Sequence, residues 1–309
     1  MDGVLVVDKP QGPTSHDVVA AARRLLGEQR IGHTGTLDPL ATGVLPLAIG
    51  RATRLVRFFT ASDKEYDATI RFGVTTDSYD ITGAETRRTG AVPSRDEVAR
   101  ALVALTGNYL QTPPAYSAKK VGGRRAYALA RLASRSPAEG GSGQDVELPA
   151  VPVRVARVEL AAFDGARARV TVTCSAGFYV RSFAHALGEL VGTGACLEAL
   201  RRTRAGEFRL EGAIRLDELH DPARVADRLV PLHALLGAWP AVTLTDRGRD
   251  RAAHGRELEA GDYAPVRADP WPLTPDPLWI RLLDGAGALV AVATPGARPG
   301  SLHPAVVLI

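Results

Sequence analysis

The sequence is poor in the residues that build metal clusters and covalent cross-links. Its 309 residues include two cysteines, Cys174 and Cys196, which is too few for a disulfide framework or a cysteine-rich metal cluster. The CxxC and HExxH patterns are both absent from the sequence. We therefore predict no metal site. Cys174 belongs to the alternating segment RVTVTCSAG, which is typical of a buried strand residue.

Long hydrophobic runs are also missing. No stretch approaches the roughly 18 uninterrupted apolar residues that a transmembrane helix needs, so we expect no membrane span. The first ten residues, MDGVLVVDKP, hold an apolar run that is too short for a signal peptide, and they lack a basic start. The sequence therefore predicts a cytoplasmic protein.

Lysine is scarce, and the charge is uneven along the chain. The net charge is +4, and arginine outnumbers lysine 34 to 4. Residues 1–239 carry 31 basic and 26 acidic groups, whereas residues 240–309 carry seven arginines and eight acids. A basic excess in the first part suits a domain that binds a polyanion. Such a small excess alone does not establish RNA binding, and a bias in coding composition explains the arginines equally well.

The patterns along the chain mix helices and strands without a regular βαβ rhythm, which favours an α+β fold. A chain of this length also favours one large domain plus a small one. Short alternating or apolar segments predict strands, and capped amphipathic segments predict helices. We expect strands over 3–10, 66–72, 167–174, 278–283 and 288–293, and helices over 15–26 (capped by Ser15), 94–105 (a Ser94–Glu97 capping box), 178–190 and 246–254.

Two further segments mark the organisation of the chain. Residues 135–147 (RSPAEGGSGQDVE) form a Gly/Ser-rich loop, and the basic stretch 119–131 before it is partly helical in pattern. A break near 237–240 separates a final segment of about 70 residues. We place the domain boundary there, with one domain over 1–238 and a second over 239–309.

The stretch RIGHTGTLDPLATGVLPLAIG, residues 30–50, is the most informative part of the chain. Asp38 lies in a loop of small residues, and glycines leave room for a ligand to approach a carboxylate closely. His33 and Thr34 add a titratable ring and a hydroxyl. The alternative is structural, because Asp followed by Pro commonly caps the start of a helix.

This stretch resembles the catalytic motif of the TruB family of tRNA pseudouridine synthases nearly residue for residue. Four other segments resemble motifs of the same family, in the same order, across about the first 210 residues. Five motifs in order make a specific pattern. The four segments are GVLVVDKPQGPTSHDVV (3–19), DKEYDATIRFG (63–73), GFYVRSFAHALGE (177–189) and LRRTRAGEF (200–208).

The resemblance implies a pseudouridine-synthase mixed-sheet catalytic domain, an insertion over about 119–150 that grips RNA, and a small β-rich PUA-like C-terminal domain. The PUA-like segment is slightly acidic and poor in motifs, so we expect a degenerate version with a weak RNA role. The implied activity is isomerisation of uridine 55 in the T-loop of tRNA, with the base flipped out of the loop. A monomer that needs no cofactor is expected.

The resemblance also assigns roles to single residues. Asp38 matches the nucleophile, Arg181 an arginine that keeps this carboxylate ionised, and Tyr66 a tyrosine that stacks on the target uracil. Whether Asp38 attacks the sugar carbon or C6 of the base stays open. Matches to the substrate pocket and its edge are His33, Tyr179, Leu200, Asp80 and Lys120, while Lys9 and Pro10 match a motif that supports the catalytic loop.

Other function classes fit less well. A non-catalytic RNA-binding protein would not need the family's residues at positions 38, 66 and 181. A phosphatase with an aspartyl nucleophile, or a two-carboxylate glycosidase, needs a second carboxylate or a metal near the first. No acid flanks Asp38 in its loop, so the sequence favours the pseudouridine synthase.

Overall fold

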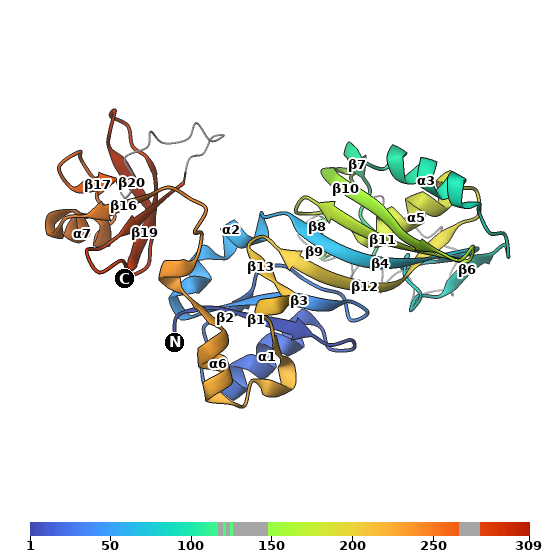
Figure 1. Cartoon of the computed structure of the whole chain (residues 1–309), viewed down its shortest axis with the longest axis horizontal. Coiled ribbons are helices and arrows are strands. Elements are labelled where there is room, and N and C mark those ends of the chain that lie inside the picture. Colours follow the sequence, from blue (N-terminus) through green and yellow to red (C-terminus); the bar gives the residue numbers. More distant parts are fainter. Residues whose placement is uncertain (117–119, 122–123, 126–147, 266–278) are drawn as a thin grey trace. The chain divides into compact units, whose positions relative to one another are not determined.

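The computed structural model of the chain describes residues 1–116, 120–121, 124–125, 148–265 and 279–309 (Figure 1). By their contacts, residues Met1–Asp38, Val44–Thr60 and Glu207–Ile309 form a first unit. Residues Pro39–Gly43 and Ala61–Gly206 form a second unit. The strands outside the C-terminal segment belong mainly to one mixed sheet, in which eleven strands are described.

In the first unit the apolar run at the start of the chain forms β1 (Gly3–Lys9), which is buried along nearly its whole length. A strand covered on both faces reads as a continuous hydrophobic run, and GVLVV is one. Strand β1 pairs in parallel with β14 (Ile214–Arg215) and antiparallel with β15 (Leu229–Pro231). Strand β2 (Ile31–His33) pairs antiparallel with β3 (Thr42–Ile49). The sheet order here is β14-β1-β3.

Helix α1 (Ser15–Leu26) begins at Ser15, so its N-cap is the residue before the predicted cap Ser15. The N-cap is Thr14: its hydroxyl accepts the N–H of Asp17 at 3.1 Å, and the Asp17 carboxylate accepts the N–H of Thr14 at 2.8 Å. This reciprocal pair is a capping box. The prediction that Ser15 caps this helix was wrong, because Ser15 is already helical and its side chain bonds elsewhere. The helix ends at Gly27, in the left-handed conformation favoured there.

The first unit has further short elements, of which β13 pairs with β12 (Ala195–Ala205) in the mixed sheet. They are η1 (Gly50–Leu55), α2 (Val56–Thr60), β13 (Phe208–Arg209), η2 (Leu210–Gly212), η3 (Leu216–Glu218), α6 (Pro222–Arg228) and η4 (Leu232–Ala234).

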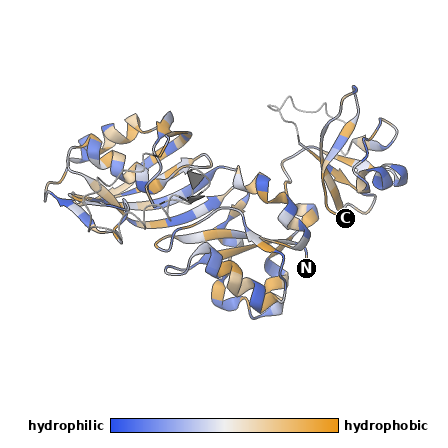
Figure 2. Cartoon of the chain, turned by 180° about the vertical axis from the view of Figure 1, so that it is seen from behind, coloured by the Kyte–Doolittle hydropathy of each residue, from blue (hydrophilic) through white to orange (hydrophobic). Residues whose placement is uncertain are grey.

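The C-terminal segment forms a five-stranded sheet in the order β17-β16-β18-β19-β20. Its apolar core includes Val242, Leu258, Ile280 and Val290, whereas helix α7 is mostly hydrophilic in colour (Figure 2). The fully buried Asp262 carboxylate lies 2.9 and 3.2 Å from the guanidinium groups of two arginines of α7. The elements are β16 (Ala241–Leu244), α7 (Asp246–Ala253), β17 (Tyr263–Pro265), β18 (Ile280–Leu283), β19 (Leu289–Pro295) and β20 (Leu302–Val307).

In the second unit the sheet order is β12-β4-β11-β10-β7. Strand β4 (Lys64–Phe72) buries every other residue, as expected of an antiparallel strand with one face on the core. It lies between β11 (Arg167–Cys174) and β12 (Ala195–Ala205), antiparallel to both. Strands β10 (Val151–Phe163) and β7 (Gly107–Gln111) continue the sheet.

Two helices are described in the second unit. Helix α3 (Arg95–Ala104) starts at the predicted capping box, in which the Ser94 hydroxyl accepts the N–H of Glu97. Helix α5 (Val180–Leu190) is amphipathic and packs against β12 and α3. The short strands are β5 (Val74–Thr76), β6 (Glu85–Arg88), β8 (Lys120–Val121) and β9 (Arg124–Arg125).

The mixed sheet with its helices and the β-rich C-terminal segment confirm the predicted fold class. Cys174 is buried on β11, as expected. The predicted loop over 135–147 and nearly all of the stretch 119–131 lie outside the described residues. In the part of the chain that the structure describes, no helix is long and apolar enough to cross a membrane.

Candidate active site

The loop that carries Asp38 joins β2 to β3. The side chains of Thr34, Leu37 and Ala41 are buried, whereas Asp38 is half-buried. A turn at residues 39–40 follows Asp38, and the chain then enters β3. No helix begins here, so the structural alternative in which Asp38 caps a helix is wrong. The carboxylate lies on an irregular loop between two strands.

The hydroxyl of Ser15 fixes this loop from the first turn of α1. It accepts the backbone N–H of Leu37 at 2.8 Å and donates to the backbone carbonyl of Leu37 at 3.1 Å. Ser15 is fully buried. Both backbone groups of the residue before Asp38 are therefore satisfied by one side chain, which restricts the backbone that aims the carboxylate.

The exit of the loop lies against β12. Gly43 has a φ of +99°, and a Cβ atom placed on it would lie 2.2 Å from the backbone oxygen of Arg202. Only glycine combines that conformation with so close an approach. The Thr42 hydroxyl donates to the carbonyl of Leu200 at 3.4 Å. Leu200, predicted to line the uridine pocket, is thus a buried residue beside the end of the loop that carries Asp38.

Tyr66 lies on the buried face of β4, 8% exposed. Its neighbours across the sheet are Val172 on β11 and Arg202 on β12. Arg202 and Lys64 are both buried cations on these strands. Burial, followed by repulsion from Arg202, lowers the pKa of Lys64 to about 8. Tyr66 therefore lies in a sheet face that concentrates positive charge, as a site for an anionic nucleotide would require.

Arg181 occupies the first turn of α5 and is buried. Its guanidinium donates to the carbonyls of Ser78 at 3.1 Å and Tyr116 at 2.9 Å. One Asp80 carboxylate oxygen lies 3.8 Å from Nη1 of Arg181, with both side chains less than a tenth exposed. The carboxylate of Asp80 also accepts the N–H of Thr82. Asp80, predicted at the edge of the substrate site, is thus an ionic partner of the predicted active-site arginine.

The loop that holds Arg181 is itself anchored. Tyr79 has a φ of +63°, which is uncommon for a residue other than glycine. Its ring stacks on His185 of α5, with the ring centres 4.0 Å apart and the planes within 5°. Burial lowers the pKa of His185 and so favours the neutral ring. This stack and the Asp80–Leu197 bridge fix the loop against the sheet.

Tyr179, predicted to line the uridine pocket, is half-buried at the N-cap of α5. Its backbone is held by the side chain of Gln111 from β7. The roles of Gln111, Ser78 and Tyr116 were not predicted from the sequence. No local pattern marks them, because each acts on a residue more than 60 positions away.

Of the other predicted residues, His33 and Lys9 lie in the first unit and Lys120 lies in the second. His33 on β2 makes an edge-to-face contact with His16, with ring centres 5.3 Å apart. Lys9 is fully buried and donates through Nζ to the carbonyl of Pro10 at 2.9 Å. This bond ties the end of β1 to the turn that follows, which agrees with a supporting role. The side chain of Lys120 lies outside the described residues.

The structure therefore groups the predicted residues into two sets. Lys9, His33 and Asp38 belong to the first unit; Tyr66, Asp80, Tyr179, Arg181 and Leu200 belong to the second. Within the second set, Arg181 and Asp80 are in contact. The union of both sets in one site stays a prediction.

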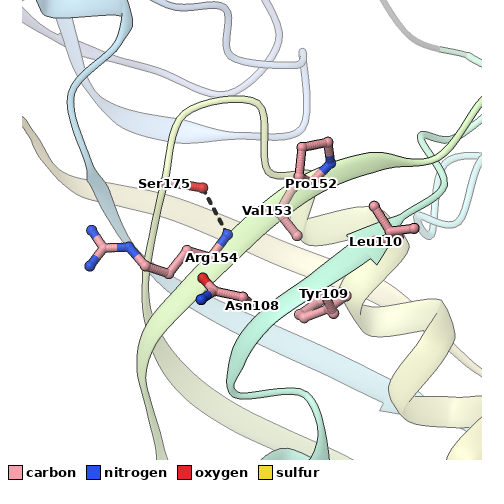
Figure 3. A pocket seen from close by; sticks show the side chains of 7 residues that line it. All are labelled: Asn108, Tyr109, Leu110, Pro152, Val153, Arg154 and Ser175. Carbon is pink, nitrogen blue, oxygen red and sulfur yellow. Dashed lines mark hydrogen bonds between the residues drawn. The ribbon is translucent and has the colours of Figure 1, made fainter.

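A separate cavity of about 420 Å³ lies at the β7 edge of the second unit (Figure 3). Residues of β7 and β10 line it together with Ser175, whose hydroxyl accepts the N–H of Arg154 at 2.9 Å. None of its lining residues is a predicted site residue, and the Arg154 guanidinium pairs with Asp63 at 2.7 Å.

Comparison with known proteins identifies the family. A family sequence model for the N-terminal domain of TruB family pseudouridylate synthases matches residues 23–180. A second, for the C-terminal domain of tRNA pseudouridylate synthase B, matches residues 181–236. The tRNA pseudouridine synthase B of Solibacter usitatus (strain Ellin6076) is 42% identical over 100% of both chains. That of Mycobacterium sp. (strain KMS) is 45% identical, covering 86% of this chain and 89% of the relative.

Solved structures show the same fold. A chain of a Cbf5-Nop10-Gar1 complex superposes with a TM-score of 0.75 at 26% identity, covering 99% of this chain and 85% of that one. A chain of an H/ACA RNP bound to a substrate RNA containing 2'-deoxyuridine gives 0.74 at 24% identity, with 99% and 85% coverage, which shows the fold alone. The chain belongs to the TruB family of pseudouridylate synthases. Enzymes of this class are isomerases, as the sequence predicted.

Proposed function

We propose that this protein converts uridine 55 in the T-loop of tRNA to pseudouridine, with Asp38 as the nucleophile. Family membership supports the reaction class, and its relatives are named as tRNA enzymes. The observation that carries the role of Asp38 is the loop itself: Ser15 fixes the residue before it, and no helix follows it. Because no helix starts at this loop, helix capping does not account for an aspartate at position 38.

The reaction is an internal rearrangement. The bond between C1' of the ribose and N1 of uracil breaks, the base turns, and a bond between C1' and C5 forms. The proton on C5 leaves and N1 gains one, so atoms and charge balance. Because nothing is oxidised or reduced, the chemistry itself calls for neither a cofactor nor a metal. A nucleophile that forms a transient covalent bond splits this step into easier ones.

Each predicted residue then has a task. The Arg181 guanidinium pairs with the Asp38 carboxylate and aims it at the nucleotide. The Tyr66 ring stacks on the target uracil and helps to remove the C5 proton. Tyr179 and Leu200 line the uridine pocket, and His33 assists extrusion of the base. Asp80 and Lys120 complete the edge of the pocket, while Lys9 and Pro10 support the loop.

Access to the uridine requires the base to leave its stack, at a cost of a few kcal/mol. Recognition of the T-arm stem-loop then rests on its shape and backbone. We assign catalysis to residues 1–238, an RNA grip to about 119–150, and a PUA-like accessory role to 239–309. The protein works in the cytoplasm as a monomer, with tRNA as its partner.

The test uses an unmodified tRNA transcript and the full chain. Pseudouridine is located by carbodiimide treatment followed by reverse transcription, which stops next to the modified base. The parent should give one new stop, at position 55. In Asp38→Asn the rate should fall by at least about 10³-fold, with tRNA binding retained.

The matched control is Asp96→Asn, which makes the same change at an exposed residue in the first turn of α3. It should modify tRNA at the parental rate. A stop at another uridine would overturn the assignment to position 55, and turnover by Asp38→Asn at a rate near that of the parent would remove Asp38 as the nucleophile.

A further inference from the structure

Helix α5 lacks a cap of its own. Its N-cap residue is Tyr179, whose side chain makes no capping hydrogen bond, and it carries no acidic residue in its first turn. The first N–H groups of a helix need partners from outside the helix, and a buried helix start without them is costly. This matters here because the same first turn carries Arg181.

The missing cap comes from another strand. The Oε1 of Gln111 accepts the backbone N–H of Tyr179 at 2.8 Å, and its Nε2 donates to the backbone carbonyl of Tyr179 at 3.1 Å. That carbonyl also accepts the N–H of Phe183, the first bond of the helix. Gln111 is 5% exposed at the end of β7. One buried carboxamide therefore holds both backbone groups of the residue that opens α5.

The chain after Gln111 continues the same attachment. The carbonyl of Thr112 accepts the hydroxyl of Ser182 at 2.8 Å, and the carbonyl of Tyr116 accepts Nη2 of Arg181 at 2.9 Å. The segment from 111 to 116 thus contacts the start of α5 at three points: the backbone of residue 179 and the side chains of residues 181 and 182. Among these contacts, only those of Gln111 use a side chain of this segment, whereas Thr112 and Tyr116 use backbone carbonyls.

We propose that Gln111 is a positioning residue for catalysis: it caps α5 from β7 and thereby sets the positions of Tyr179, which lines the uridine pocket, and of Arg181, which aims Asp38. This proposal rests on the proposed function. Removing the carboxamide leaves the helix intact but lets its first turn shift. A shift of this first turn lowers the rate of the chemical step more than the affinity for tRNA. Affinity depends mainly on the shape and backbone of the RNA, which other parts of the protein recognise.

The first experiment measures single-turnover rates and tRNA dissociation constants of full-length variants. Gln111→Met keeps the size of the side chain and removes both hydrogen bonds. We expect its rate at saturating tRNA to fall at least tenfold, with the dissociation constant within about twofold of the parent. A parental rate, or a loss confined to tRNA affinity, would overturn the proposal.

The second variant, Gln111→Glu, supplies a rescue. Its carboxylate can still accept from the N–H of Tyr179 but cannot donate to the carbonyl. Once protonated, the carboxyl group regains that donor. Burial raises the pKa of such a group, so the rate relative to Gln111→Met should rise as the pH falls from 8 to 6. A ratio that does not change with pH would count against the hydrogen bond to the Tyr179 carbonyl.

The titratable and charged groups on β7, on its partner strand β10 and on α5 are Tyr109, then Arg154, Arg157 and Glu159, then Arg181, His185 and Glu189, with Tyr179 at the N-cap of α5. All variants keep them, so the ratio reports position 111 alone. The matched control is Asn108→Asp, the same amide-to-acid change at an exposed residue of the same strand. Its rate relative to the parent should show no dependence on pH.

Hydrogen exchange separates the two proposals. In Gln111→Met, the amides of residues 179–182 should exchange at least tenfold faster than in the parent, while those of β4 and β11 stay unchanged. If the parent makes no pseudouridine, the proposed function fails, but this measurement still decides whether Gln111 caps α5. Unchanged exchange at residues 179–182 would overturn the capping role whatever the activity.

Discussion

The hydroxyl of Ser15 holds both backbone groups of Leu37, accepting its N–H at 2.8 Å and donating to its carbonyl at 3.1 Å. The two residues lie 22 positions apart, one in the first turn of a helix and the other next to Asp38. The pair joins the N-terminal helix to the loop that carries Asp38.

Replacing Ser15 should therefore slow catalysis. Ser15→Ala leaves the buried N–H and carbonyl of Leu37 without this partner, which costs about 1–3 kcal/mol of stability. We expect a single-turnover rate reduced about tenfold or more, since the residue before Asp38 is released. Thr14→Ala is the control: it removes the cap of the same helix at a cost of about 1 kcal/mol and should leave the rate unchanged. Equal rates for the two variants would contradict the link between Ser15 and the loop.

The close approach at Gly43 predicts intolerance of any side chain. In Gly43→Ala the new Cβ would lie 2.2 Å from the carbonyl oxygen of Arg202, at a φ of +99°. We expect the free energy of unfolding to fall by more than about 2 kcal/mol, as measured by urea denaturation. Gly212→Ala is the control, because that glycine has open space around its Cβ position. A Gly43→Ala protein as stable as Gly212→Ala would show that the loop exit is not as described.

The buried ion pair between Arg181 and Asp80 should contribute far more to stability than ion pairs on the surface. Asp80→Ala removes a buried carboxylate 3.8 Å from the guanidinium, leaving a buried positive charge short of compensation. We expect a loss of about 3 kcal/mol. The exposed Arg215–Asp217 pair gives the comparison, since Asp217→Ala should change stability far less than Asp80→Ala does. Thermal unfolding of both variants, side by side, measures the difference.

The buried Lys64 predicts a pH dependence of stability. Its pKa is lowered from 10.5 to about 8 in the folded protein, so between these values the unfolded state binds more protons, and stability rises with pH. Below pH 8 both states are protonated and the folded state carries the full cost of the buried charge. Lys64→Met should therefore be more stable than the parent at pH 7, by at most about 3 kcal/mol.

This advantage should shrink as the pH rises from 8 towards 10, because the lysine of the parent then loses its charge on folding. Urea denaturation of both proteins at several pH values measures it. A difference that stays constant between pH 7 and 10 would mean that Lys64 has an ordinary pKa.

Local patterns predicted what depends on neighbours in the chain. The alternation in RARVTVTC gave β11, and the Ser94–Glu97 box gave α3, because each signal spans only a few residues. The Ser15 cap was wrong by one position, since Thr14 and Ser15 are both good caps and the deciding partner is Asp17, three residues after Thr14. The choice between two adjacent cap residues therefore depends on a partner further along the chain.

The supports of the site could not be predicted in this way. Gln111 acts on Tyr179 across 68 positions, and Asp80 pairs with an arginine 101 residues further along the chain. Both contacts exist only because the sheet brings β7, α5 and the loop after β5 together in the second unit. A glutamine at a strand end has no local signature, so only the structure shows what it holds.

Release of tritium from tRNA labelled at C5 of its uridines tests the central claim most directly, because loss of the C5 hydrogen accompanies every turnover. We expect release equal to one uridine per tRNA for the parent and for Asp96→Asn, and no release above background for folded, tRNA-binding Asp38→Asn. Release by Asp38→Asn that reaches the parental extent at a comparable rate would contradict this expectation.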